Sequence, residues 1–118
     1  GQLGREYFKD GLEAIRERSP GSKRIIVFTD DITHSKKTFT DWGFETPSIK
    51  WASSDLTAAE VLVLMSGVEW LISSNSTLSF WAGHLNLAGN VICPSEWEIG
   101  MNNHLAHDSW VQLNPAWC

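Results

Sequence analysis

The segment LISSNSTLSFWAG, from Leu71 to Gly83, sets a run of small polar side chains between two apolar segments. The polar run covers residues 73–77 and consists of serine, asparagine and threonine. This pattern is typical of a buried strand that ends, turns and enters a helix. Two interpretations of the run compete: its residues cap the helix, or its hydroxyl and backbone N–H groups form a cradle for an anion.

Outward from this segment, the apolar pattern alternates between helix-like and strand-like periods along the chain. The first predicted elements are a helix over 5–18, a strand over 24–29, a loop with a short helix over 30–43 and a strand over 49–52. A second helix follows, which Ser54 or Asp55 caps and Gly67 ends, and then a strand over 69–73. The last elements are a helix that begins at Thr77 and ends at Gly89, a strand over 90–94 and a strand over 109–113.

Strands separated by helices of this length predict right-handed crossovers and an α/β fold, with a parallel sheet covered by helices on both faces. A chain of 118 residues suits a single domain over 1–118. In such sheets a ligand binds at the C-terminal ends of the strands. That rule indicates three places: residues 29–31, residues 73–76, and Pro94 with Ser95.

The composition is that of a soluble globular protein, with 42% hydrophobic and 19% charged residues. The net charge of -5 argues against a nonspecific nucleic-acid binder, which is normally basic. No apolar run reaches the ~20 residues of a membrane span. Two cysteines define no disulfide framework, so Cys93 and Cys118 are expected to be free thiols.

Two adjacent carboxylates, Asp30 and Asp31, follow the first predicted strand. They could accept hydrogen bonds from a nucleoside, hold a metal, or simply cap a helix and close a turn. A response-regulator receiver also carries an acidic pair at this point, but it needs an aspartate where this chain has Ser73 and Ser74. The receiver interpretation is therefore excluded.

Other signals for metal or nucleotide chemistry are weak. His104 and His107 stand three residues apart, which suits two metal ligands on a helix, but no third ligand is evident and a solvated loop is expected. Neither the dinucleotide fingerprint GxGxxG nor the phosphate-binding GxxxxGK[ST] occurs.

Four segments taken together resemble the C-terminal half of glycosyltransferase family 11, the α-1,2-fucosyltransferases. They are IIVFTDDI, LVLMS, LISSNSTLSFWAGHLN and VICPSEW, in that order. The family pattern has S/T-D-D after a strand, L-M-S at a helix end, an N-S-S/T-F-S-W-W segment and P-x-x-W. The resemblance extends from about Tyr7 to Leu113, and the N-S-T segment is its most specific part.

The resemblance implies the C-terminal lobe of a GT-B-type enzyme, a three-layer Rossmann-like fold that binds GDP-fucose. The implied reaction transfers L-fucose with inversion to the 2-hydroxyl of a galactose-terminated glycan, without metal or cofactor. Two aspartates would shape the nucleoside pocket and four residues would line a diphosphate cradle: Asp30 and Asp31 for the first, and Asn75, Ser76, Thr77 and Ser79 for the second.

The family's H-x-R-R-G-D motif does not occur in the sequence. The chain is therefore expected to be a C-terminal fragment or domain, nearly inactive alone. The N-terminal acceptor lobe, with the catalytic residues, would lie outside it. For the full-length protein the resemblance implies peripheral membrane association, in the cytoplasm at the inner face of the membrane for a bacterial-type enzyme or in the Golgi for a eukaryotic one.

The sequence departs from the family pattern at several positions. Val61 replaces an aspartate, residues 68–70 replace C-K-H, and Leu78 and Phe80 stand where Phe and Trp are common. These departures bear on the donor-pocket contacts. Two rival interpretations stay open: a lobe of another nucleotide-sugar transferase, or a non-catalytic α/β module that binds nucleotides or a protein partner.

Overall fold

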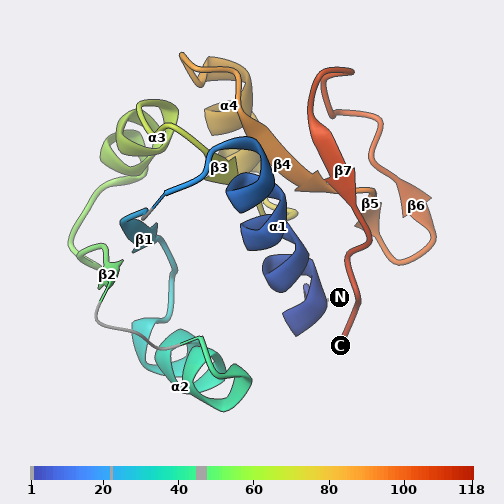
Figure 1. Cartoon of the computed structure of the whole chain (residues 1–118). Helices are drawn as coiled ribbons and strands as arrows, with labels where there is room; N and C mark the ends of the chain where they lie inside the picture. Colours follow the sequence, from blue (N-terminus) through green and yellow to red (C-terminus); the bar gives the residue numbers. More distant parts are fainter. Residues whose placement is uncertain (1, 22, 45–47) are drawn as a thin grey trace. The chain divides into compact units, whose positions relative to one another are not determined.

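The computed structural model describes residues 2–21, 23–44 and 48–118. It is a mixed α/β structure with parallel sheets and four helices in the described residues (Figure 1). The chain divides into two compact units, a larger one of residues 1–20 and 58–118 and a smaller one of residues 21–57. The single domain expected over 1–118 stays a prediction.

The larger unit holds most of the regular elements. They are α1 (Arg5–Arg18), α3 (Ala58–Ser66), β3 (Leu71–Ile72), α4 (Thr77–Leu85), β4 (Val91–Pro94), β5 (Glu96–Glu98), β6 (Met101–Asn102) and β7 (Val111–Leu113). Strands β3, β4 and β7 form a parallel sheet with β4 at its centre, and β5 pairs with β6 in an antiparallel ribbon.

The core of the larger unit forms around β4, whose four residues are all buried. On one face, Ala14 and Ile15 of α1 pack against Ile92. Side chains alternate along a strand, so Val91 points to the other face. There Gly83 of α4 comes so close that an added Cβ would stand 3.3 Å from the Val91 side chain and 2.8 Å from the ring of Trp110. The two helices thus contact different faces of this sheet.

The smaller unit is built from β1 (Ile25–Val27), α2 (Ile32–Trp42) and β2 (Ile49–Trp51). The two strands pair in parallel, with Val27 opposite Trp51. Helix α2 ends at Trp42, and its C-cap Gly43 has a φ of 82°, the left-handed conformation that glycine adopts without strain. Aromatic rings replace a conventional core here, because Phe39 contacts Trp42, Phe44 and Trp51 while α2 has no buried residue.

The sequence predicted most of these elements but not how the strands associate. Strand pairing in the described residues is divided between two parallel sheets, where a single sheet was expected. The β5–β6 ribbon was not predicted, because its strands are short and its turn depends on the Glu96 side chain, which accepts a bond of 2.7 Å from the Gly100 N–H.

Two predicted helix boundaries were wrong. Helix α3 begins at Ala58, after Ser54 and Asp55, because the Ser53 hydroxyl accepts the Asp55 N–H and holds those residues in a turn. Helix α4 ends at Leu85 with Asn86 as its C-cap, before Gly89. The Asn86 amide explains the early end, because its oxygen accepts the Gly89 N–H and its nitrogen donates to the Val68 carbonyl.

The prediction about membrane spans agrees with the structure. Within the described residues, every helix is too short or too polar to cross a bilayer.

Candidate functional site

The polar run of residues 73–77 joins β3 to the start of α4. We call residues 73–79 the serine turn. Ser76 is the N-cap of α4, with an extended backbone, and its Oγ accepts a hydrogen bond of 3.1 Å from the Ser79 N–H. The capping interpretation is therefore correct for Ser76. A cap and an anion cradle can share one structure, because capping leaves other N–H groups of the first turn unbound.

Three hydroxyl groups of the serine turn form a small network. The Oγ atoms of Ser76 and Ser79 lie 2.9 Å apart, and the Oγ of Ser74 lies 3.1 Å from that of Ser79 and 3.3 Å from that of Ser76. Ser79 is only 5% exposed, whereas Ser76 and Thr77 are exposed. The network is thus accessible to solvent at Ser76, next to the exposed Thr77, and buried at Ser79.

The N-terminus of α4 presents donors and no negative side chain. Its first turn contains no acidic residue. The N–H groups of Thr77 and Leu78 begin the helix, where no intrahelical partner exists, and they have no hydrogen bond to another described residue. Orphan N–H groups, the helix dipole and neutral hydroxyls together suit an anion such as a phosphate.

Tyr7 of α1 lies beneath the start of the serine turn. Its side chain is 0% exposed, and its hydroxyl donates a hydrogen bond to the backbone carbonyl of Ser73. Burial, with a smaller contribution from Cys93, raises the pKa of Tyr7 well above 10, and burial raises the pKa of the Cys93 thiol to about 11. Both groups therefore stay protonated near neutral pH. Sequence reasoning missed this contact, because Tyr7 and Ser73 lie far apart along the chain.

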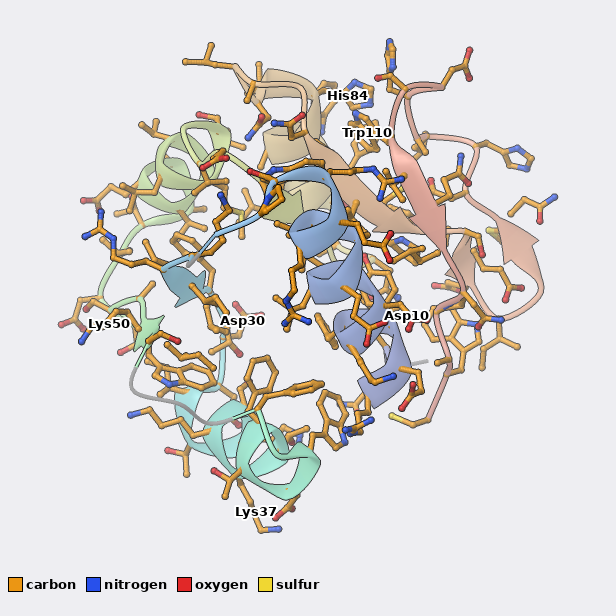
Figure 2. The ribbon with its side chains drawn as sticks, viewed as in Figure 1. Asp10, Asp30, Lys37, Lys50, His84 and Trp110 are labelled. Atoms are coloured by element: carbon orange, nitrogen blue, oxygen red, sulfur yellow. The ribbon has the colours of Figure 1, made fainter. Side chains whose placement is uncertain are left out.

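Aromatic side chains and the β5–β6 ribbon also contact the serine turn and α4. The Asn75 side chain donates to the Trp97 carbonyl at 3.3 Å, which ties the serine turn to β5. The ring centroids of His84 and Trp110 lie 4.5 Å apart with tilted planes, and the His84 Nε2 lies 3.0 Å from the Leu105 carbonyl. Both side chains are labelled in Figure 2. Asn75 therefore holds the turn in place, and no local pattern predicts that Trp97 is its partner.

Asp30 and Asp31, the two aspartates of the other candidate loop, belong to the smaller unit. Figure 2 labels Asp30. Asp31 is the N-cap of α2, and its Oδ1 accepts a bond of 3.0 Å from the His34 N–H. The Thr29 hydroxyl accepts the Asp31 N–H and lies 2.7 Å from the Ser35 hydroxyl. Asp30 is exposed. The capping interpretation thus holds for Asp31, while Asp30 is open to a ligand.

The remaining predicted places are Pro94 with Ser95 and the histidine pair. Pro94 and Ser95 are engaged by the protein itself, because the Pro94 carbonyl accepts the Asn103 side chain and the Ser95 N–H donates to Leu113. In the ranges 2–21, 23–44 and 48–118, no cluster of three or more metal-ligating side chains occurs, and His107 bonds to Ser109. Cys93 and Cys118 are free thiols, as expected.

Comparison with known proteins finds a relative that aligns with nearly the whole chain. The O-antigen biosynthesis glycosyltransferase WbnK of Escherichia coli is 30% identical over 120 aligned residues, which cover 96% of this chain and 37% of that protein. The chain thus spans little more than a third of the length of this curated relative. No solved structure matches it significantly. The sequence profile described as Glycosyl transferase family 11 matches residues 3–106, which include both aspartates and the whole serine turn. The chain belongs to glycosyltransferase family 11.

Proposed function

We propose that this chain is the donor-binding part of an inverting galactoside α-1,2-fucosyltransferase whose donor is GDP-fucose. The observation that carries the proposal is the serine turn, which offers unbound N–H groups and neutral hydroxyls at the C-terminal end of a parallel strand. This turn lies inside the segment that matches the family. A diphosphate is the anion that a nucleotide-sugar donor brings to such a turn.

Within this proposal the residues of the serine turn have different tasks. Ser76, Thr77 and the first N–H groups of α4 hold the diphosphate. Ser79 is buried beneath them, so it orients the Ser76 hydroxyl, and Asn75 fixes the turn against β5. Asp30 and Asp31 contribute to the nucleoside pocket as hydrogen-bond acceptors for ribose or base.

The proposed chemistry needs stabilisation of a leaving group. The 2-hydroxyl of a galactose-terminated acceptor attacks the anomeric carbon of fucose, the bond to GDP breaks, and the configuration inverts. Donors aimed at the diphosphate oxygens stabilise the charge that develops on GDP. The α4 N-terminus supplies such donors, so we invoke no metal or cofactor.

The proposal also covers the fold of the chain and the cellular location of the full-length protein. We assign the chain to the C-terminal lobe of a GT-B-type enzyme with a three-layer Rossmann-like arrangement. The contacts of α1 and α4 with different faces of the β3–β4–β7 sheet support this. The acceptor site and the catalytic residues would belong to an N-terminal lobe. We place the full-length protein in the cytoplasm with a peripheral membrane association, as suits assembly of a surface glycan.

The first experiment is a titration of the chain with GDP, with UDP and ADP as controls, by calorimetry or ligand-observed NMR. Selective binding of GDP is expected. A preference for UDP would favour another nucleotide-sugar transferase, and absence of any preference would favour a non-catalytic module.

The second experiment removes donors from the proposed cradle. Replacing Ser76 and Thr77 together by alanine should weaken GDP binding by a few-fold to tens-fold, at ~1 kcal/mol per lost neutral hydrogen bond. Ser109→Ala serves as a matched control, because that exposed serine contacts His107 away from the turn. An unchanged GDP affinity in the double variant would refute the cradle.

A further inference from the structure

The hydrogen-bond ladder between β3 and β4 stops at the start of the serine turn. The Leu71 N–H donates to the Asn90 carbonyl at 2.9 Å, and the Ser73 N–H donates to the Ile92 carbonyl at 2.7 Å. In a parallel ladder of this register, the next bond would run from the N–H of residue 94 to the Ser73 carbonyl.

Residue 94 cannot donate that bond, because it is a proline and has no N–H. Proline is unusual in a central strand for this reason, yet Pro94 is fully buried at the end of β4. Ser73 is only 2% exposed, so water does not readily replace the missing donor. A buried carbonyl of this kind needs a partner from elsewhere in the fold.

Tyr7 supplies the partner. Its buried hydroxyl donates to the Ser73 carbonyl and lies 3.4 Å from the Ile92 carbonyl, which already accepts the Ser73 N–H. Because burial raises the pKa of Tyr7, the hydroxyl keeps its proton and can donate throughout the neutral range.

We propose that Tyr7 is a positioning residue: its hydroxyl takes the place of the ladder bond that Pro94 cannot make and thereby fixes the serine turn for phosphate binding. The link to phosphate rests on the proposed function. Ser73 is the first residue of the turn, and its own Oγ donates to the Ser74 carbonyl at 2.8 Å. Ser74 in turn contacts the hydroxyls of Ser76 and Ser79. A peptide that rotates at Ser73 therefore disturbs the whole network.

The direct test is amide hydrogen exchange in Tyr7→Phe, which keeps the ring and removes the hydroxyl. The reporter is the Ser79 amide, which is bonded to the Ser76 hydroxyl. Its exchange should accelerate about five-fold or more, the factor that one lost hydrogen bond implies. Ile15→Val is the matched control, because it loosens α1 against Ile92 without touching the Ser73 carbonyl. If Tyr7→Phe accelerates Ser79 exchange no more than Ile15→Val does, the proposal is overturned.

A second-site variant tests the mechanism even if Tyr7→Phe destabilises the chain. Pro94→Ala restores an N–H at the position from which the ladder bond would come. In the double variant with Tyr7→Phe, Ser79 exchange should return to within about two-fold of Pro94→Ala alone, since the two donors serve one carbonyl. If instead the two substitutions act independently, the shared role is refuted.

GDP binding separates this proposal from the proposed function. Where the unaltered chain binds GDP, Tyr7→Phe should weaken binding about three- to ten-fold, because the turn loses its fixed position. Faster Ser79 exchange with unchanged GDP affinity overturns the role in phosphate binding. If the unaltered chain binds no GDP, the donor-site function fails for this chain, while the exchange comparison still decides whether Tyr7 positions the turn.

Discussion

Two of the strand-to-helix junctions in the described residues, β1 to α2 and β3 to α4, have a similar capping arrangement. Each follows a parallel strand, and each begins its helix with a side-chain cap on the N–H three residues ahead. Asp31 caps α2 with an oxygen 3.0 Å from the His34 nitrogen, and Ser76 caps α4 with an oxygen 3.1 Å from the Ser79 nitrogen. Local capping alone therefore does not distinguish their functions.

The junctions differ in charge. Asp30 and Asp31 place two carboxylates at the start of α2, where they satisfy the helix dipole themselves. The start of α4 carries no acidic residue and leaves its first N–H groups for a ligand. One junction therefore suits hydrogen-bond donors such as ribose hydroxyls, and the other suits an anion. The cap residue, Asp31 in one junction and Ser76 in the other, is thus what gives the two helix starts a different charge.

The units that carry the junctions also differ in packing. In the larger unit the serine turn follows a sheet whose central strand is fully buried and whose end is held by Tyr7. In the smaller unit α2 has no buried residue, and the pairing is limited to two short strands. Short two-stranded sheets are marginal by themselves. We therefore expect the serine turn to be the more rigid of the two junctions.

The largest expected effect tests this difference in packing. Ile92→Ala should lower the free energy of unfolding by about 3 kcal/mol, because the side chain is fully buried between α1 and the sheet. Ile26→Ala in β1 removes the same atoms from a residue that is 51% exposed and should cost under about 1 kcal/mol. Urea denaturation of both variants measures the two values. Equal losses would show that the units are equally well packed.

The second-largest expected effect is a loss of stability of the larger unit at alkaline pH. The folded chain raises the pKa of Cys93 from 9.0 to about 11, so it keeps a proton that the unfolded chain releases. The contribution is complete below pH 9 and is lost as the pH rises toward 11, by about 2 kcal/mol. Tyr7, with its raised pKa, adds to the loss above pH 10.

Urea denaturation at several pH values from 8 to 11 measures this effect. Cys93→Ala should decline less steeply between pH 9 and 11 than the unaltered chain. Cys118→Ala is the control, since that exposed thiol should leave the slope unchanged. Parallel curves for Cys93→Ala and the unaltered chain would contradict the assignment to Cys93.

A substitution of the cap tests the charge difference between the junctions. Ser76→Asp keeps a good N-cap, so the stability of the chain should change little. It gives α4 the carboxylate that α2 has, and it should weaken GDP binding about ten-fold by repulsion of the phosphates. The loss should shrink at high salt. Ser76→Asn is the neutral control that retains the cap, and an equal loss for both variants would show that charge is not the cause.

The smallest effect concerns the cap of α2. Asp31→Ala removes the partner of the His34 N–H and should destabilise the smaller unit by about 1 kcal/mol. Exchange of the His34 amide is the most direct measurement. Asp41→Ala, which breaks only the exposed pair with Lys37, should cost under about 0.5 kcal/mol and serves as the comparison. If both variants behave alike, Asp31 is no more than a surface charge.

The sequence by itself determined the local features. The period of the apolar residues indicated α1 over 5–18, and short apolar runs indicated the strands around Ile26, Ile49 and Ile92. The caps at Asp31 and Ser76 were within reach of the same reasoning. The helix and the caps depend on bonds between residues a few positions apart, and the strands are marked by short apolar runs, so the residue types in a short window contain the information. The roles of these residues in donor binding stay predictions.

Only the tertiary structure decided the features that join distant parts of the chain. The division into two sheets, the tie from Asn75 to Trp97 and the support of Ser73 by Tyr7 all depend on which surfaces meet after the chain closes on itself. A proline in one strand and a tyrosine in a distant helix carry no local sign of their relation. The missing N–H of Pro94 matters only because the strand register places it opposite the Ser73 carbonyl. That buried carbonyl must then accept a hydrogen bond from a donor elsewhere in the fold.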